Sequence, residues 1–240
     1  SNAWYAKWQF KIPAQAAEKE VYMEYRITGS IVPAVEIALQ AGESMYTQSG
    51  GMSWKTEGIE MSTNTRGGLL KGIGRMFSGE SLFMATYTAS RPGIIAFAST
   101  VPGSVLPVSL EQTGTLIIQK GAFLCAQPSV SLEITFTKKL SSGFFGGEGF
   151  ILQKLYGRGM AFLEIDGDAV EKTLAPGETL YVDTGNVVGF ESTVAYETEM
   201  VKGLGNIFFG GEGLFLTKLT GPGKVILQTL NFGDFTGKIF

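Results

Sequence analysis

A repeated glycine-rich segment is the feature that most constrains the fold of this chain. The stretch FFGGEGFILQKLYGRGMAFL (144–163) aligns without a gap to FFGGEGLFLTKLTGPGKVIL (208–227), 64 residues further along. A more divergent copy, MFSGESLFMATYTASRPGIIAFA (76–98), precedes the first by 68 residues. Repeats this small cannot bury their apolar faces alone and therefore stack on one another. The sequence thus indicates a triplication.

A second sequence feature, a glycine after an apolar segment, recurs in the same place in each copy. Three glycines, Gly50, Gly121 and Gly185, end equivalent apolar segments at spacings of 71 and 64 residues. We therefore predict one domain of three repeats around a pseudo-threefold axis. The repeats cover residues 24–93, 94–159 and 160–231. Residues 1–23 are an amino-terminal extension whose first three residues resemble the remainder of a cleaved tag, and residues 232–240 are a carboxy-terminal tail.

Hydrophobic periodicity predicts an all-β fold. Short segments alternate apolar and polar residues between glycine, proline or asparagine, as expected of strands with one buried face. The clearest such segments are residues 35–39, 115–119, 130–136 and 179–183. With 33 glycines and frequent turn signals, the chain fits a barrel, a sandwich or a β-helix. Weak helical patterns occur only at residues 13–20 and 68–77.

Composition excludes several classes of function. The 240 residues contain no histidine, which excludes Ser/His/Asp and Cys/His nucleophile arrangements and the usual mixed zinc sites. The 19 basic and 22 acidic side chains are spread along the chain, so we expect no nucleic-acid partner. The single cysteine, Cys125, cannot form an internal disulfide and is interpreted as a small buried apolar residue.

Apolar runs of only a few residues are far shorter than the roughly 20 that a membrane-spanning helix needs. We therefore expect a cytoplasmic protein, soluble or peripheral to a membrane. A reducing cytoplasm suits the lone cysteine, although an exported protein without disulfides would have the same composition.

Three stretches carry a resemblance to a known family: GSIVPAVEIALQAGESMYTQSGGMSW, GGLLKGIGRMFSGESLF and FFGGEGLFLTKLTGPGKVILQTL. The chain from about residue 23 to residue 230 resembles the altered-inheritance-of-mitochondria family, relatives of a mitochondrial biogenesis factor with a fold like the tryptophan RNA-binding attenuation protein. The resemblance implies three copies of a shortened double-stranded β-helix and higher oligomers. It implies no catalytic residues, and its mitochondrial member is linked to inner-membrane organisation. The extension WYAKWQFKIPAQAAEKE departs from the family pattern.

The Gly-Glu segments admit three interpretations. In the first, Glu80, Glu148 and Glu212 meet at the threefold axis and bind a cation, since hard cations prefer clustered oxygen ligands. In the second, the glycines adopt positive φ in tight turns and the glutamates are solvated. In the third, the paired aromatics Phe144, Phe145, Phe208 and Phe209 lie exposed at loop tips and contact a partner or a membrane; core packing is the alternative for these rings.

The segment GGLLKGIGRMF (67–77) has the composition of a short basic amphipathic element. Its apolar and basic residues suit a membrane interface, or a loop that caps one end of the barrel. The candidate contact residues are Leu69, Leu70, Lys71, Ile73, Arg75 and Phe77. A separate carboxylate pair, Asp166 and Asp168 in EIDGDAV, is interpreted as a hairpin turn with glycine at positive φ, not as a catalytic pair.

These observations favour a non-enzymatic β protein that forms homo-oligomers and acts as a binding or scaffold module, with a membrane surface or another protein as partner. The alternative is a protein that binds a small ligand or a metal ion in its barrel cavity or at the axis glutamates. No cofactor is expected.

Overall fold

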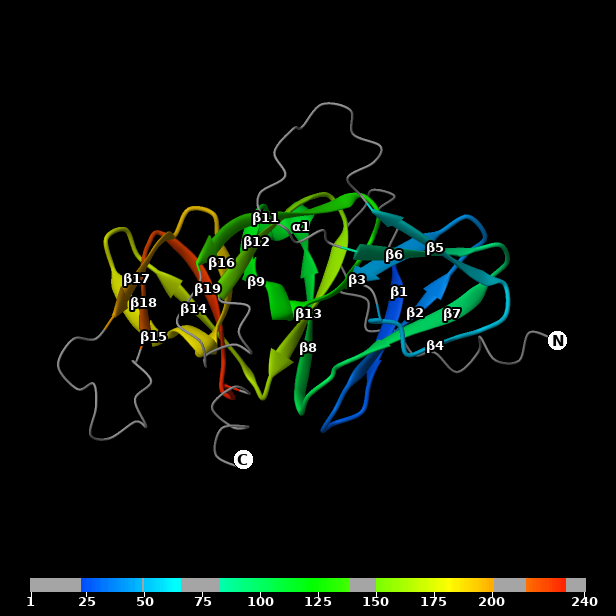
Figure 1. Ribbon diagram of the computed structural model, residues 1–240, viewed down its shortest axis with the longest axis horizontal. Coiled ribbons are helices and arrows are strands. Elements are labelled where there is room, and N and C mark those ends of the chain that lie inside the picture. Colours follow the sequence, from blue (N-terminus) through cyan, green and yellow to red (C-terminus); the bar gives the residue numbers. More distant parts are fainter. Residues whose placement is uncertain (1–22, 49, 66–82, 139–149, 201–214, 232–240) are drawn as a thin grey trace, which may run out of the picture.

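The computed structural model describes residues 23–48, 50–65, 83–138, 150–200 and 215–231. Within these residues the chain is all-β, with antiparallel strands in four sheets (Figure 1). The predicted fold class is confirmed at this level. The predicted segments 35–39, 115–119, 130–136 and 179–183 correspond to the strands Ala34–Leu39, Leu116–Gln119, Val130–Lys138 and Thr179–Asp183.

The strands fall into three consecutive groups. The first contains β1 (Glu24–Thr28), β2 (Ala34–Leu39), β3 (Ser44–Gln48), β4 (Trp54–Lys55), β5 (Ile59–Thr65), β6 (Phe83–Ala89) and β7 (Gly93–Ala98). The second contains β8 (Gly103–Ser109), β9 (Leu116–Gln119), β10 (Phe123–Ala126), β11 (Val130–Lys138), β12 (Phe150–Gly157) and β13 (Met160–Asp166). The third contains β14 (Ala169–Leu174), β15 (Thr179–Asp183), β16 (Val187–Glu191), β17 (Ala195–Met200), β18 (Phe215–Thr220) and β19 (Gly223–Gln228).

The same four antiparallel pairings occur in each group. In the first group β2 and β4 pair with β7, while β3 and β5 pair with β6. In the second, β8 and β10 pair with β13, while β9 and β11 pair with β12. In the third, β14 and β16 pair with β19, while β15 and β17 pair with β18. Strand β1 is additional and pairs with β2.

Neighbouring groups are joined by one kind of strand contact. Strand β3 of the first group pairs antiparallel with β10 of the second, with Tyr46 opposite Ala126. Strand β9 of the second group pairs in the same way with β16 of the third, with Ile117 opposite Phe190. Each junction therefore fuses strands of two groups into one six-stranded sheet.

The two junctions arrange the groups in a row (Figure 1). Strands β4 and β15, which a closed threefold arrangement would pair, lie at opposite ends of this row and each has one partner strand among the described residues. The predicted arrangement around a pseudo-threefold axis is thus not confirmed. The physical reason is that strand pairing at the two junctions extends the sheets without bringing the outer edges together.

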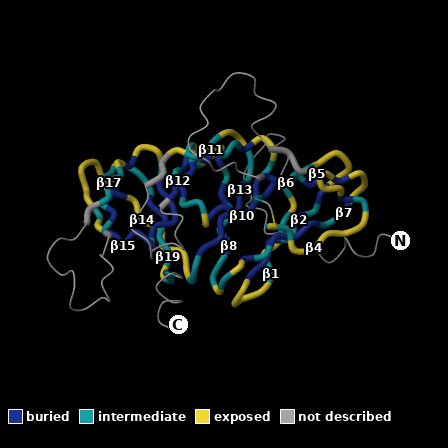
Figure 2. The backbone as a smooth tube through the Cα atoms, viewed as in Figure 1, coloured by how far each residue is buried: buried dark blue, intermediate teal, exposed yellow. Residues whose placement is uncertain are grey.

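The buried apolar residues of the described segments form three clusters along the row, with buried strands such as β10 and β13 at its centre (Figure 2). The largest cluster combines residues of all three groups, among them Tyr46, Leu163 and Val188. Tyr46 is fully buried, donates a hydrogen bond to the Val130 carbonyl at 3.1 Å and stacks on Phe123 with ring centroids 5.5 Å apart. Because the groups share these contacts, each buries apolar surface that it could not bury alone.

The IDGD segment differs in part from its prediction. Gly167 has φ +72°, as expected of a turn glycine. However, the segment is not a hairpin turn, because β13 pairs with β10 and β8 whereas β14 pairs with β19. The turn instead carries the chain from the second group to the third. A hairpin could not be distinguished from such a crossover by local sequence, since both need the same turn residues.

A single turn of α-helix, α1 (Leu110–Thr113), was not predicted. The Thr113 hydroxyl donates to the Ser109 carbonyl at 3.0 Å, and Gly114, at φ +70°, ends the turn. The helical patterns at residues 13–20 and 68–77 lie outside the described residues.

Candidate functional site

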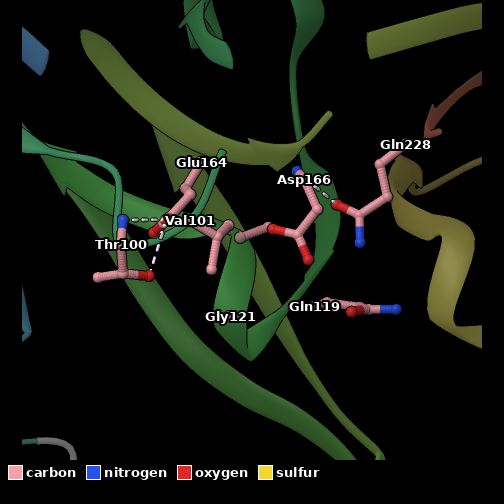
Figure 3. A pocket seen from close by; sticks show the side chains of 8 residues that line it. Thr100, Val101, Gln119, Gly121, Glu164, Asp166 and Gln228 are labelled. Carbon is pink, nitrogen blue, oxygen red and sulfur yellow. Dashed lines mark hydrogen bonds between the residues drawn. The ribbon is translucent and has the colours of Figure 1, made fainter. Parts of the chain in front are cut away.

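A polar pocket lies where the second and third groups meet (Figure 3). Its volume is about 220 Å³. The walls come from the β7–β8 connection, the end of β9 with the turn that follows, and the carboxyl ends of β13 and β19. The lining residues are Thr100, Val101, Gln119, Gly121, Ala122, Glu164, Asp166 and Gln228.

Glu164 is the buried carboxylate of this pocket, with 9% of its surface exposed. One carboxylate oxygen, Oε1, accepts hydrogen bonds from the Thr100 backbone N–H at 2.5 Å and from the Thr100 hydroxyl at 2.9 Å (Figure 3). Hydrogen bonds to a charged acceptor are stronger than neutral ones and offset part of the cost of burying the charge. Glu164 therefore fixes the β7–β8 connection against β13.

Gln228 occupies the position in the third group that Glu164 occupies in the second. Its Oε1 accepts from the Asp166 backbone N–H at 3.1 Å, as Glu164 accepts from Thr100 (Figure 3). Its Nε2 donates to the Gly185 carbonyl at 2.9 Å. A glutamate cannot make this second bond because a carboxylate has no N–H donor. The two equivalent positions thus share one backbone contact and differ in charge.

The side-chain amide of Gln119, which also lines the pocket, forms a hydrogen bond as well. Gln119 donates through Nε2 to the Thr184 carbonyl at 2.8 Å, which ties β9 to the turn after β15. With Gln119 and Gln228 held to the backbone of the third group, two walls of the pocket are fixed by the fold. Fixed polar walls are typical of sites formed before a ligand binds.

Carboxylate and amide oxygens dominate the pocket, so it suits a small polar ligand with hydrogen-bond donors or a cation. Glu164 and Asp166 are two residues apart on β13 and project to the same face of the sheet. In the described ranges, no three His, Cys, Asp or Glu side chains come close enough to form a metal site. The pocket is therefore a candidate for polar recognition.

Cys125 is fully buried, as the sequence predicted. Burial raises the pKa of the Cys125 thiol well above its usual value, because the thiolate would lose its hydration. The thiol is therefore protonated at neutral pH.

Every predicted site residue lies outside the described residues. This holds for the glutamates Glu80, Glu148 and Glu212, for the segment with Leu69, Leu70, Lys71, Ile73, Arg75 and Phe77, and for Phe144 and Phe208. The segments that contain them, 66–82, 139–149 and 201–214, join β5 to β6, β11 to β12 and β17 to β18, which are equivalent strand pairs.

Sequence reasoning missed the pocket. Its key contact joins Thr100 to Glu164, 64 residues later in the chain. A signal for it does exist, because the repeat alignment places Glu164 and Gln228 at the same position, 64 residues apart. A polar residue retained at equivalent positions of otherwise apolar strands indicates a structural or binding contact.

Exposed aromatic side chains mark the two ends of the row. Trp54 on β4 is 46% exposed and Tyr181 on β15 is 55% exposed. Both lie on strands whose outer edge has no partner among the residues that the structure describes. Unpaired strand edges with large apolar side chains favour association with another strand.

The fold and the pocket together define an all-β protein built from recurring antiparallel strand groups, with no helix in the described segments long and apolar enough to cross a membrane. The family of mitochondrial biogenesis protein AIM24 matches the chain over residues 25–230. The chain belongs to this family, which confirms the resemblance drawn from its motifs.

Two relatives from Streptococcus pyogenes agree with this assignment. An uncharacterized protein of serotype M6 is 30% identical over 215 residues, covering 86% of this chain and 85% of the relative. A crystal structure of another S. pyogenes protein superposes with a TM-score of 0.72 at 27% identity, covering 91% of this chain and 98% of that one. These matches assign the family and the fold but no activity.

Proposed function

We propose that the protein is a non-catalytic scaffold that assembles with copies of itself and presents its glycine-rich segments to a partner at a membrane surface. The observation that carries the proposal is modular construction. The chain joins successive strand groups through one kind of strand contact, and among the residues that the structure describes the complementary edge at each end has no partner strand. Such a row can be extended by further units without any new type of contact.

The units of the scaffold are three repeats of a shortened double-stranded β-helix. Support comes from the four pairings that recur in each group. On this scheme we place the repeats at β2–β7, β8–β13 and β14–β19. The boundaries then fall in the turns after Ala98 and Asp166, later than the predicted boundaries at residues 93 and 159, because β7 and β13 pair with the first strand of their own group.

The membrane contact rests on residues 67–77, whose leucines and basic side chains have the composition of an interfacial element. One short apolar element binds a membrane weakly, and repetition in an assembly multiplies the binding. Self-association and membrane binding therefore support each other in this proposal.

The test measures the solution mass by light scattering and binding to vesicles that contain anionic lipid by co-sedimentation. The proposal expects a defined assembly that sediments with the vesicles. It also expects that changing Leu70 and Phe77 to Ser releases the protein from vesicles with its mass unchanged. A monomer that stays in the supernatant would overturn the proposal.

The pocket supports a second candidate function, the binding of a small polar ligand or a cation. The observation in its favour is the pair Glu164 and Asp166 in a pocket with fixed amide walls. A ligand that binds only the folded state raises the melting temperature. A screen of divalent cations and small amines should find one whose stabilisation is lost in Asp166→Asn and kept in Asp168→Asn. If no compound shifts the melting temperature, this candidate is wrong.

A further inference from the structure

We propose that β15 of one copy pairs antiparallel with β4 of a second copy, in the register of the two internal junctions, so that Tyr181 lies opposite Lys55. This inference rests on the self-association proposed above and identifies the surface that mediates it. It makes the contact between copies a third instance of the junction that the chain already forms twice.

The first half of the contact follows from the equivalence of β3, β9 and β15. Each forms the same ladder with the returning strand of its own group: Met45 lies opposite Tyr87, Leu116 opposite Leu155, and Leu180 opposite Leu219. The next residue of each strand is Tyr46, Ile117 or Tyr181. On β3 and β9 these residues form the junction, opposite Ala126 and Phe190. On β15 the corresponding residue is Tyr181.

The second half follows from the equivalence of β4, β10 and β16. Trp54 lies opposite Ala96, Cys125 opposite Phe162, and Gly189 opposite Ile226. The next residue is Lys55, Ala126 or Phe190. Since Ala126 and Phe190 are the junction residues of β10 and β16, Lys55 is the junction residue of β4. Combining the two ladders places Lys55 of one copy opposite Tyr181 of another.

Burial separates the internal strands from the terminal ones. All four residues of β10 and four of the five in β16 are buried, whereas both residues of β4 are exposed. Tyr46 is fully buried at its junction, whereas Tyr181 is 55% exposed. The terminal strands thus expose at the ends of the row the positions that the junctions bury. A second copy would cover them with an edge of the complementary type.

The β4 edge is held in place before association. Trp54 donates through Nε1 to the Glu36 carboxylate at 3.3 Å, and the Lys55 ammonium donates to the Ile59 carbonyl at 2.7 Å. Holding side chains in position reduces the entropy cost of binding. Because β4 and β15 are different surfaces, the contact is heterologous and joins copies head to tail. The assembly is therefore a closed ring or a filament, not a two-fold dimer.

The test uses a charge swap at the predicted pair. Tyr181→Lys places like charges opposite each other and removes apolar contact, so the concentration needed for half-assembly should rise by about tenfold. Adding Lys55→Glu to the same chain restores opposite charges and should recover most of that loss. Met61→Lys is the matched control, since Met61 is 56% exposed on the edge strand β5 and should leave assembly unchanged.

A disulfide experiment gives an independent readout of the register. Directly opposite residues of antiparallel strands lie within disulfide range, so a chain with Tyr181→Cys and Lys55→Cys should form a ladder of crosslinked copies under oxidation. Chains with either change alone should not form a ladder.

The outcomes distinguish the two proposals. Monomeric wild-type protein overturns both. An assembly that survives Tyr181→Lys leaves self-association standing and overturns the assignment of these edges. Loss of assembly without recovery in the double variant, together with no crosslinked ladder, overturns the register. Recovery and a ladder support it.

Discussion

Tyr46 and Tyr181 occupy equivalent positions on β3 and β15, yet Tyr46 is fully buried and Tyr181 is 55% exposed. Tyr46 is covered by β10 of the next group, whereas β15 has no following group in the described chain. A tyrosine at equivalent positions of two strand groups is therefore part of the core in the first group and part of the surface in the third. The difference is caused by the neighbour, not by the local sequence.

Removing the Tyr46 hydroxyl should destabilise the fold. Tyr46→Phe leaves the Val130 carbonyl without its 3.1 Å hydrogen bond in a buried environment, which costs about 1 kcal/mol. Tyr181→Phe is the matched control and should change the free energy of unfolding by less than about 0.5 kcal/mol, because the ring is exposed. Urea unfolding measures both. Equal effects of the two changes would argue against the junction.

Glu164 should tolerate glutamine better than alanine. Glu164→Gln keeps an oxygen that accepts from Thr100, as Gln228 does from Asp166, and should cost less than about 1 kcal/mol. Glu164→Ala leaves the Thr100 N–H without this acceptor and should cost about 1 to 3 kcal/mol. The comparison requires urea unfolding of the two variants. If they are equally stable, the Thr100 contact contributes nothing.

Gly189 should be intolerant of a side chain. A Cβ atom there would lie 2.7 Å from the Ile117 carbonyl oxygen and 2.8 Å from Ile118 Cγ2, at the junction of β9 and β16. Gly189→Ala should therefore cost about 1 to 3 kcal/mol. Gly121→Ala is the control, since no atom lies within 4 Å of its Cβ position, and it should be close to neutral. Thermal unfolding of both variants checks the difference.

Cys125 should be unreactive in the folded protein. Its thiol is fully buried and its pKa is raised, so little thiolate is accessible. A thiol reagent at pH 8 should modify the chain rapidly in guanidinium chloride and far more slowly in buffer. Rapid modification of the native protein would show that the core around β10 opens readily.

The Cys125 thiol should make the free energy of unfolding depend on pH in the alkaline range. Because the folded pKa is raised, the unfolded chain loses the thiol proton first, and the free energy of unfolding falls as pH rises above the unfolded pKa of about 8.5. The loss is at most about 1.4 kcal/mol per pH unit for one group. Cys125→Ala should remove this part of the decline. A variant with the wild-type slope between pH 8 and 10 would contradict the assignment.

Much of the fold follows from the sequence because strand patterns are local. The alternation in residues 35–39 and 179–183 predicted β2 and β15, and the position of Gly167 predicted a turn residue with positive φ. The pocket did not follow, because Thr100 and Glu164 are brought together by pairing of β8 with β13. Nothing local in either residue indicates that contact. The predicted cation and membrane residues remain predictions, since they lie outside the described residues.

The sequence by itself determined that this is an all-β chain without histidine chemistry, since both properties are carried by composition and short-range periodicity. Only the tertiary structure decided that the groups form a row whose terminal edges have no partner among the described strands, that Asp166 and Asp168 flank a crossover, and that Tyr181 is exposed where Tyr46 is buried. Those outcomes depend on which distant strands share hydrogen bonds. Equivalent strand edges offer the same backbone hydrogen-bonding groups, so packing across the whole chain determines which of these edges pair.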